Sequence, residues 1–244
     1  ATGTTVDLGA GADTLVLGAF VNTVTVSNVE TVTGGSTNDT VVLTGAVTGG
    51  TFDLGAGDDT LVFDALGATV TVTGVETITA SAADDRVTLG DQATGATIDL
   101  GQGNDTLVLG AFVNTVTVSN VETVTGGASA DTVTLATQAT GISIDLAGGS
   151  DTLILGDFRN TVTVSNVETI TGGTSADSIV LGTQLTGATI DLGDGTDTLT
   201  LGAFLNTVTV TAVETITGGS TNDTVVLGGQ ATGSVIDLGA GLDK

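Results

Sequence analysis

The chain has 244 residues, enough for one sizeable core, and its 28 acidic against 3 basic residues give a formal net charge of −25. This charge disfavours nucleic acid and anionic membrane surfaces as partners, because both attract positive charge, and makes cations the natural partners. The sequence contains no Cys and no His, which excludes disulfides and the usual zinc, copper or iron ligands, and no apolar run reaches the ~18 residues of a transmembrane helix.

The first predicted unit is DLGAGADTLVL at residues 7–17, in which a glycine-rich acidic turn precedes an apolar strand. Variants of it return at a spacing of 46 residues, so residues 1–244 hold five 46-residue repeats and a partial sixth. Residues 17–35 and 109–127 are identical, and neither a linker nor a change of composition separates the repeats. The sequence therefore predicts a single domain over residues 1–244.

Strands are predicted along the whole chain. Val, Thr, Ile and Leu alternate with period two and glycine clusters punctuate them, whereas Thr, Val and Gly are poor helix formers. After the first turn, Leu15 and Leu17 are expected to point inward, and Leu107 and Leu109 are expected to do the same two repeats later. Coils stacked about 4.8 Å apart would place such residues in continuous apolar columns.

A weaker repeat lies inside each 46-residue unit. Residues 76–89 align without a gap on residues 96–109, and the turn aspartates are spaced alternately by 26 and 20 residues. We expect each half-unit to form one coil, with the longer coil holding an additional strand near residues 23–26. The predicted fold class is all-β, a parallel β-solenoid with about two coils per 46-residue repeat.

The turns carry the candidate chemistry. In GAGAD at residues 9–13, the glycines can adopt positive φ and aim carbonyl groups into the turn, and Asp13 adds a carboxylate. Calcium prefers six to eight oxygen ligands drawn from carboxylates and backbone carbonyls. The turns therefore predict calcium sites. The alternative is that Gly–Asp sequences are simply favourable turns with solvated carboxylates.

These turns resemble the nonapeptide GGxGxDxUx of the RTX (repeats-in-toxin) family, a calcium-binding parallel β-roll. Residues 8–16 (LGAGADTLV) and 100–108 (LGQGNDTLV) match its glycines, its aspartate and its apolar position. In every second turn another residue replaces the inner glycine: Thr37, Ala83, Ser129, Ser175 and Thr221. The resemblance implies a secreted bacterial protein, extracellular or at the cell surface, that binds several calcium ions between consecutive turns.

The resemblance further implies that the turn aspartates form one ladder on one edge of the stack. These aspartates are Asp13, Asp39, Asp59, Asp85, Asp105, Asp131, Asp151, Asp177, Asp197, Asp223 and Asp243. The accompanying glycine ligands would be Gly9, Gly11, Gly55, Gly57, Gly101, Gly103, Gly149, Gly193, Gly195, Gly239 and Gly241. One Ca²⁺ in each of the ten gaps would change the net charge to −25 + 20 = −5.

Other acidic positions also recur. Asp7, on an outward strand position before the turn, could join the calcium shell or cap the amides of the turn. Glu30, in the repeated VET, is expected to be a solvated or hydrogen-bonded corner residue. Neighbouring carboxylates such as Asp58 and Asp59 should diverge, and the chain lacks His, Cys and Tyr, so we expect no enzyme activity.

Two classes of function remain. The first is a calcium-rigidified rod in a bacterial adhesin, surface layer or matrix filament, which the regularity of the chain favours. The second is a calcium-triggered folding and secretion module of a type I-secreted toxin or enzyme. A lesser alternative is an ice-binding solenoid, because Thr23 and Thr25 have equivalents in TVTV segments once per 46 residues. Residues 231–244 align with residues 1–14, which predicts end-to-end self-association or a longer array.

Overall fold

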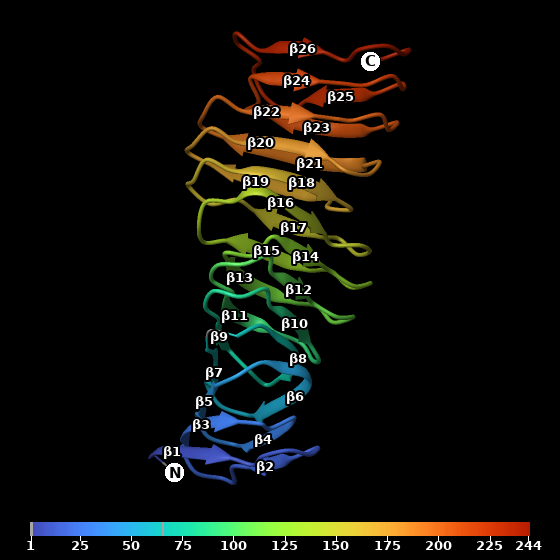
Figure 1. Cartoon of the computed structure of the whole chain (residues 1–244). Helices are drawn as coiled ribbons and strands as arrows, with labels where there is room; N and C mark the ends of the chain where they lie inside the picture. Colours follow the sequence, from blue (N-terminus) through green and yellow to red (C-terminus); the bar gives the residue numbers. More distant parts are fainter. Residues whose placement is uncertain (1, 65) are drawn as a thin grey trace. The chain divides into compact units, whose positions relative to one another are not determined.

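The structure is a computed structural model that describes residues 2–64 and 66–244 (Figure 1). Its described residues form β-strands and turns, and none of them belongs to a helix that could span a membrane. The strands pair in parallel, which confirms the predicted all-β parallel solenoid. The chain divides into two compact units, residues 1–123 and 124–244. The expectation of a single domain stays a prediction.

The first unit contains two parallel sheets, one of odd-numbered and one of even-numbered strands. Its strands are β1 (Thr2–Asp7), β2 (Thr14–Val16), β3 (Thr23–Ser27), β4 (Thr31–Gly35), β5 (Thr40–Leu43), β6 (Val47–Gly55), β7 (Thr60–Phe63), β8 (Ala68–Thr73), β9 (Thr77–Thr79), β10 (Arg86–Leu89), β11 (Thr94–Asp99), β12 (Thr106–Val108) and β13 (Thr115–Ser119). The next strand, β14 (Thr123–Thr125), contains the boundary between the units.

The second unit repeats this arrangement, again with odd-numbered and even-numbered strands in separate parallel sheets. Its strands are β15 (Thr132–Leu135), β16 (Thr140–Asp145), β17 (Thr152–Ile154), β18 (Thr161–Ser165), β19 (Thr169–Gly173), β20 (Ser178–Leu181), β21 (Thr186–Gly193), β22 (Thr198–Thr200), β23 (Thr207–Thr211), β24 (Thr215–Thr217), β25 (Thr224–Leu227) and β26 (Val235–Asp237). One coil therefore consists of one strand from each sheet and the two turns that join them.

The length of a coil differs from the expectation. Thr23 pairs with Thr40 and Thr40 pairs with Thr60, so successive coils take 17 and 20 residues. The predicted coil lengths of 20 and 26 residues were wrong. The reason is that segments without a turn aspartate, such as residues 17–22, also close a corner of a coil. The TVTV segment at residues 23–26 is consequently not an extra strand of a long coil but part of β3, which belongs to its own coil.

A 46-residue repeat spans five strands, which is two and a half coils. Asp7 ends β1, the equivalent Asp53 lies in β6, and Asp99 ends β11. Consecutive repeats thus place equivalent residues in opposite sheets, and the turns that follow them lie at opposite edges of the solenoid. In the second unit, Asp145 in β16 and Asp191 in β21 alternate in the same way.

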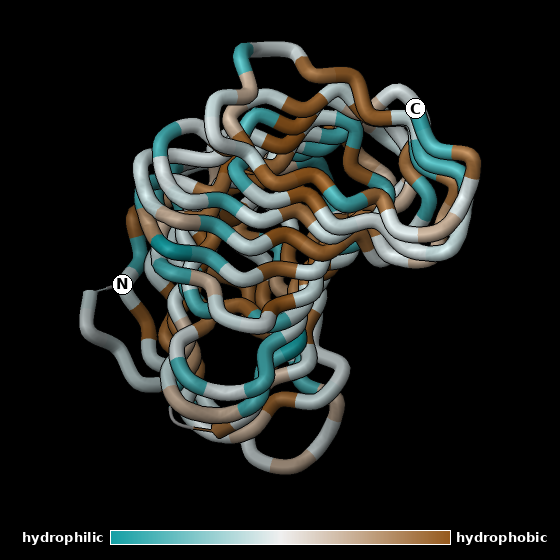
Figure 2. Tube along the Cα trace, turned by 90° about the horizontal axis from the view of Figure 1, so that it is seen from above, coloured by the Kyte–Doolittle hydropathy of each residue, from teal (hydrophilic) through white to brown (hydrophobic). Residues whose placement is uncertain are grey.

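The core of each unit lies between its two sheets. Val41, Leu61 and Ile78 stack on adjacent odd strands and are at most 1% exposed. Leu107 and Leu109 are fully buried, as predicted for the inward positions. Apolar segments of successive coils lie over one another within each unit (Figure 2). A coil alone leaves its apolar side chains exposed, so burial comes from stacking.

Candidate metal centre

The glycine-rich turns have the conformation that their sequence predicts. Gly57 and Gly103 have φ of 152° and 155°, and Gly55 and Gly101 have φ of 90° and 84°. These values are unfavourable for residues with a side chain. At Gly57 a Cβ would also lie 2.9 Å from the backbone nitrogen of Asn38, in the turn one coil earlier. The inner glycine is therefore needed for the close approach of two turns.

Each glycine-complete turn stacks on a turn that lacks the inner glycine. In one such pair, Ala56 N donates a hydrogen bond to Gly35 O at 3.0 Å, and Asp39 N donates to Asp59 Oδ1 at 2.6 Å. The substituted turns are therefore not defective copies of the complete ones. They form the lower half of a two-turn arrangement, and only the upper half requires the inner glycine.

The turn aspartates accordingly form stacked pairs whose members are 20 residues apart in the sequence. The pairs are Asp39–Asp59, Asp85–Asp105, Asp131–Asp151, Asp177–Asp197 and Asp223–Asp243, each joined by a backbone N–H to Oδ1 hydrogen bond. In the first unit, Asp39 and Asp59 lie where even strands lead to odd strands, whereas Asp85 and Asp105 lie at the opposite edge. The predicted single ladder was wrong, because 46 residues make a half-integral number of coils.

Other residues continue each pair along its edge. In the first unit, Asn22 precedes Asp39 and Asp59, and Glu76 follows them. Asn22 N donates to Asp39 Oδ1 at 2.8 Å, and Asp59 N donates to Glu76 Oε2 at 2.8 Å. In this column each side-chain oxygen caps the backbone N–H one coil earlier. The nonapeptide pattern contains neither the Asn nor the Glu, so our sequence reasoning missed the column. The signal was the recurrence of these residues at fixed distances from the turn aspartates.

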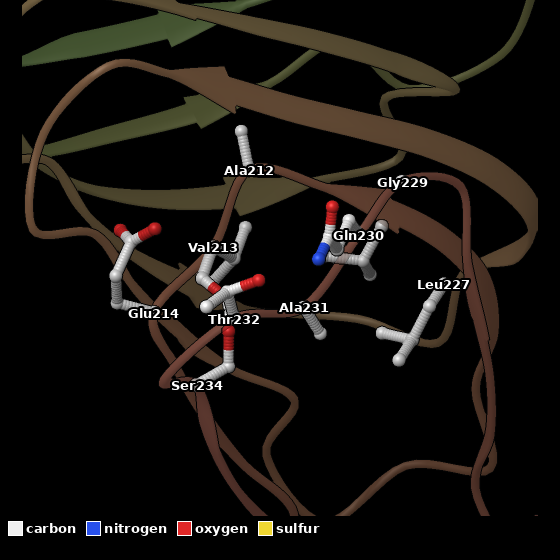
Figure 3. A pocket seen from close by; sticks show the side chains of 10 residues that line it. Ala212, Val213, Glu214, Leu227, Gly229, Gln230, Ala231, Thr232 and Ser234 are labelled. Atoms are coloured by element: carbon white, nitrogen blue, oxygen red, sulfur yellow. Dashed lines mark hydrogen bonds between the residues drawn. The ribbon is translucent and has the colours of Figure 1, made fainter.

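A small residue follows the glutamate in the column and leaves a cavity. In the first unit Glu76, Gln92 and Ala93 line this cavity. In the second unit Glu214 and Gln230 are among the residues that line the equivalent cavity, where Figure 3 shows them on opposite sides. Neither cavity is lined by a stacked aspartate pair, so the candidate metal chemistry stays with the paired turns.

The paired aspartates are buried. Asp59, Asp105 and Asp197 are 0% exposed, and their Oδ1 atoms each accept one backbone hydrogen bond. The Oδ2 atoms of seven aspartates are buried without a hydrogen-bond partner among the described residues: Asp39, Asp59, Asp105, Asp151, Asp177, Asp197 and Asp223. A buried carboxylate with one oxygen unsatisfied is costly unless a cation or a proton compensates for it.

The electrostatics of the turns show this cost. Burial raises the pKa of Asp105, Asp151 and Asp197 to about 6, and the neighbouring carboxylate of a glutamate adds to the effect in each case. Burial also raises the pKa of Asp59, Asp85 and Asp177. These aspartates hold their negative charge at neutral pH against a penalty that a bound cation would remove.

The donor set fits calcium. Each pair supplies carboxylate oxygens, and the stacked turns bring backbone carbonyls close to them. No group of three or more Asp, Glu, His or Cys side chains is placed to hold a metal among residues 2–64 and 66–244. An ion between two turns would therefore use the two aspartates of the pair together with backbone oxygens. The individual aspartate and glycine ligands predicted from the sequence stay a prediction.

The other recurrent acidic residues have structural contacts. Asp7 Oδ1 accepts hydrogen bonds from Gly9 N at 3.1 Å and from Asn28 Nδ2 at 2.8 Å, and the contact with the Asn28 side chain is the main cause that lowers the pKa of Asp7. Asp7 therefore caps the turn, one of its two predicted alternatives. Glu30 Oε2 accepts the backbone N–H of Asp13 at 2.9 Å, which confirms a hydrogen-bonded corner residue.

The paired acidic turns and the two parallel sheets define a calcium-binding β-solenoid of the repeat type. A family model for the RTX calcium-binding nonapeptide repeat (4 copies) matches residues 97–116, which include the Asp105 turn and β12. This match and the parallel solenoid fit an RTX-type β-roll, and RTX nonapeptide repeats bind calcium. A comparison with curated proteins found no match.

Proposed function

We propose that the chain is a structural module of an extracellular bacterial protein, such as an adhesin, a surface layer or a matrix filament, and that calcium stiffens it. The observation that carries this proposal is the recurrence of the buried aspartate pairs in both units, at the end of one repeat and the start of the next. Every repeat thus invests its acidic residues in holding coils together. An enzymatic role has no support in this arrangement.

The alternative is a calcium-triggered folding and secretion module of a type I-secreted toxin or enzyme. Both roles use the same ion sites, but they differ in what calcium must do to the folded chain. A load-bearing module should resist extension more strongly when calcium is bound. A secretion module needs calcium only to fold. End-to-end self-association stays a prediction, which sedimentation with and without calcium would test.

The test of the proposal compares the protein in chelator with the protein in millimolar calcium. We expect calcium to raise the midpoint of thermal unfolding, because an ion that binds only the folded turns stabilises them by mass action. We also expect it to raise the force at which single molecules unfold under extension. Equal midpoints in both solutions would remove calcium from the function. Equal forces with different midpoints would favour the secretion module.

A second candidate, ice binding, is favoured by one observation. Thr40, Thr60 and Thr77 occupy one column on adjacent odd strands of the first unit, so the threonines recur on successive coils rather than once per 46 residues. Such a column presents hydroxyl groups at the strand spacing of about 4.8 Å. Thermal hysteresis of the wild type and of Thr60→Tyr would test this candidate. A wild type without hysteresis would dismiss it.

A further inference from the structure

A buried asparagine precedes the aspartate pair on the same column. Asn160, which is 0% exposed, donates from Nδ2 to Leu155 O at 3.1 Å and to Phe158 O at 2.7 Å. Its Oδ1 accepts the backbone N–H of Ala139 at 2.9 Å. The asparagine thus fixes a loop, residues 155–160, in which the side chain of Phe158 is 41% exposed.

The same asparagine holds the first carboxylate of the pair. Asn160 N and Nδ2 both donate to Asp177 Oδ1, at 2.9 and 3.0 Å. Asn206 does the same to Asp223 Oδ1 at 2.9 and 3.1 Å. Asn22 likewise donates twice to Asp39 Oδ1, at 2.8 and 3.0 Å. In each case two donors fix Oδ1 and leave Oδ2 of the same carboxylate buried and without a hydrogen-bond partner among the described residues.

One repeat provides a natural exception. Ala68 occupies the equivalent position below the Asp85–Asp105 pair, and its backbone nitrogen makes a single hydrogen bond to Asp85 Oδ1 at 2.6 Å. A lone donor fixes the position of one oxygen but restrains rotation of the carboxylate plane less than two donors do. Asp85 is not among the aspartates whose Oδ2 is buried and unsatisfied. The exception therefore coincides with a different environment of the carboxylate.

We propose that the buried asparagine is a positioning residue of the calcium site. By donating twice to Oδ1, it turns Oδ2 of the first aspartate towards the ion, and through its bonds to the Phe158 loop it connects the ion site with that loop. An aspartate in its place would supply no donor and would add a third carboxylate beside the pair. This inference rests on the proposed function, because it assumes that calcium occupies the paired turns.

Three variants separate this role from a general effect on folding. Asn160→Ala should weaken calcium binding at the Asp177–Asp197 pair about 10–100-fold, the usual effect of losing a residue that orients a metal ligand. Ala68→Asn should strengthen binding at the Asp85–Asp105 pair. Asn166→Ala is the matched control, because Asn166 Nδ2 donates to Asp145 Oδ1 at 2.7 Å, outside the pairs. The control should leave every calcium affinity unchanged.

The measurement is calcium titration calorimetry on each variant, with chemical denaturation in chelator to record the stability without calcium. The second readout is fluorescence, since the chain contains neither Trp nor Tyr and Phe158→Trp would be its only such fluorophore. We expect calcium to change its emission, and the change at the high-affinity step to disappear when Asn160→Ala is added.

The outcomes are distinct. Unchanged affinities in both Asn160→Ala and Ala68→Asn would overturn the inference while the proposed calcium function stands. An equal loss of affinity in Asn160→Ala and in the control Asn166→Ala would also overturn it, because the effect would then follow general stability. A wild type that binds no calcium would overturn the proposed function and the inference together.

Discussion

The carboxylate of Asp105 has two oxygens with different tasks. Oδ1 accepts the backbone N–H of Asp85 at 2.7 Å, and Oδ2 is buried without a hydrogen-bond partner among the described residues. The first oxygen holds one coil to the next whether or not an ion is present. The second gains only from a cation or a proton. The turn aspartate is therefore both a cap of the backbone and a candidate ligand.

Substitutions at Asp105 should separate these two tasks. Asp105→Asn keeps an acceptor for Asp85 N but loses the charge, so we expect the loss of one calcium ion with little loss of stability in chelator. Asp105→Ala also leaves the N–H of Asp85 unpaired, which should cost about 1–3 kcal/mol in chelator. Calorimetry and urea unfolding measure both effects. Asp91→Ala, outside the pairs, is the control, and a calcium loss there equal to that of Asp105→Asn would contradict the assignment.

The raised pKa values predict an unusual pH dependence. Asp105, Asp151 and Asp197 have folded-state pKa values of about 6 against an ordinary value of 3.8, so the folded chain binds more protons than the unfolded chain between these values. The calcium-free protein should therefore become more stable as the pH falls from 7.5 to 5. In calcium this gain should shrink, because protons compete with the ion. Thermal unfolding in chelator at both pH values checks the sign, and a lower midpoint at pH 5 would contradict it.

At the scale of the element, the sequence predicted the strands and their inward residues well. Periodicity identifies these features, and Val41, Leu61 and Leu107 are buried as expected. The coil length was not predictable from the acidic turns alone. Corners such as residues 17–22 turn without a turn aspartate, so counting the aspartate turns counted too few coils. The pairing of the aspartates depends on that count, which is why the turns were recognised individually but assembled into the wrong ladder.

Turn stacking predicts that two glycines respond differently to the same substitution. Gly57→Ala places a Cβ 2.9 Å from Asn38 N, whereas at Gly45, with φ of 104°, a Cβ meets nothing within 4 Å. Both substitutions strain the backbone, but only the first forces two turns apart. We expect Gly57→Ala to cost about 1–3 kcal/mol more than Gly45→Ala in urea unfolding. Equal losses would mean that the turns do not need their close contact.

At the scale of the whole molecule, the pairing changes the number of predicted ions. Ten gaps in one ladder become five pairs, each with room for one ion between its two turns. Five Ca²⁺ would change the net charge to −25 + 10 = −15, rather than −5. The saturated protein should therefore remain strongly acidic.

Calcium stoichiometry tests this count directly. We expect calorimetry or equilibrium dialysis to give about five tightly bound ions per chain, because an ion between pairs would have a glutamate or asparagine in place of a second turn aspartate. Electrophoretic mobility at saturating calcium supplies an independent measure of the remaining charge. A stoichiometry near ten would restore an ion at every coil and would contradict the pairing.

The half-integral number of coils in a repeat gives the chain a parity. Asp7, Asp53 and Asp99 occupy odd, even and odd strands in turn. Gain or loss of one repeat by genetic duplication or deletion would leave each local junction intact but move every later turn to the opposite edge. Gain or loss of two repeats would leave the edges as they were. Lineages of such arrays that depend on one edge for contact should therefore change length in steps of 92 residues, whereas arrays that use both edges are free to change in steps of 46.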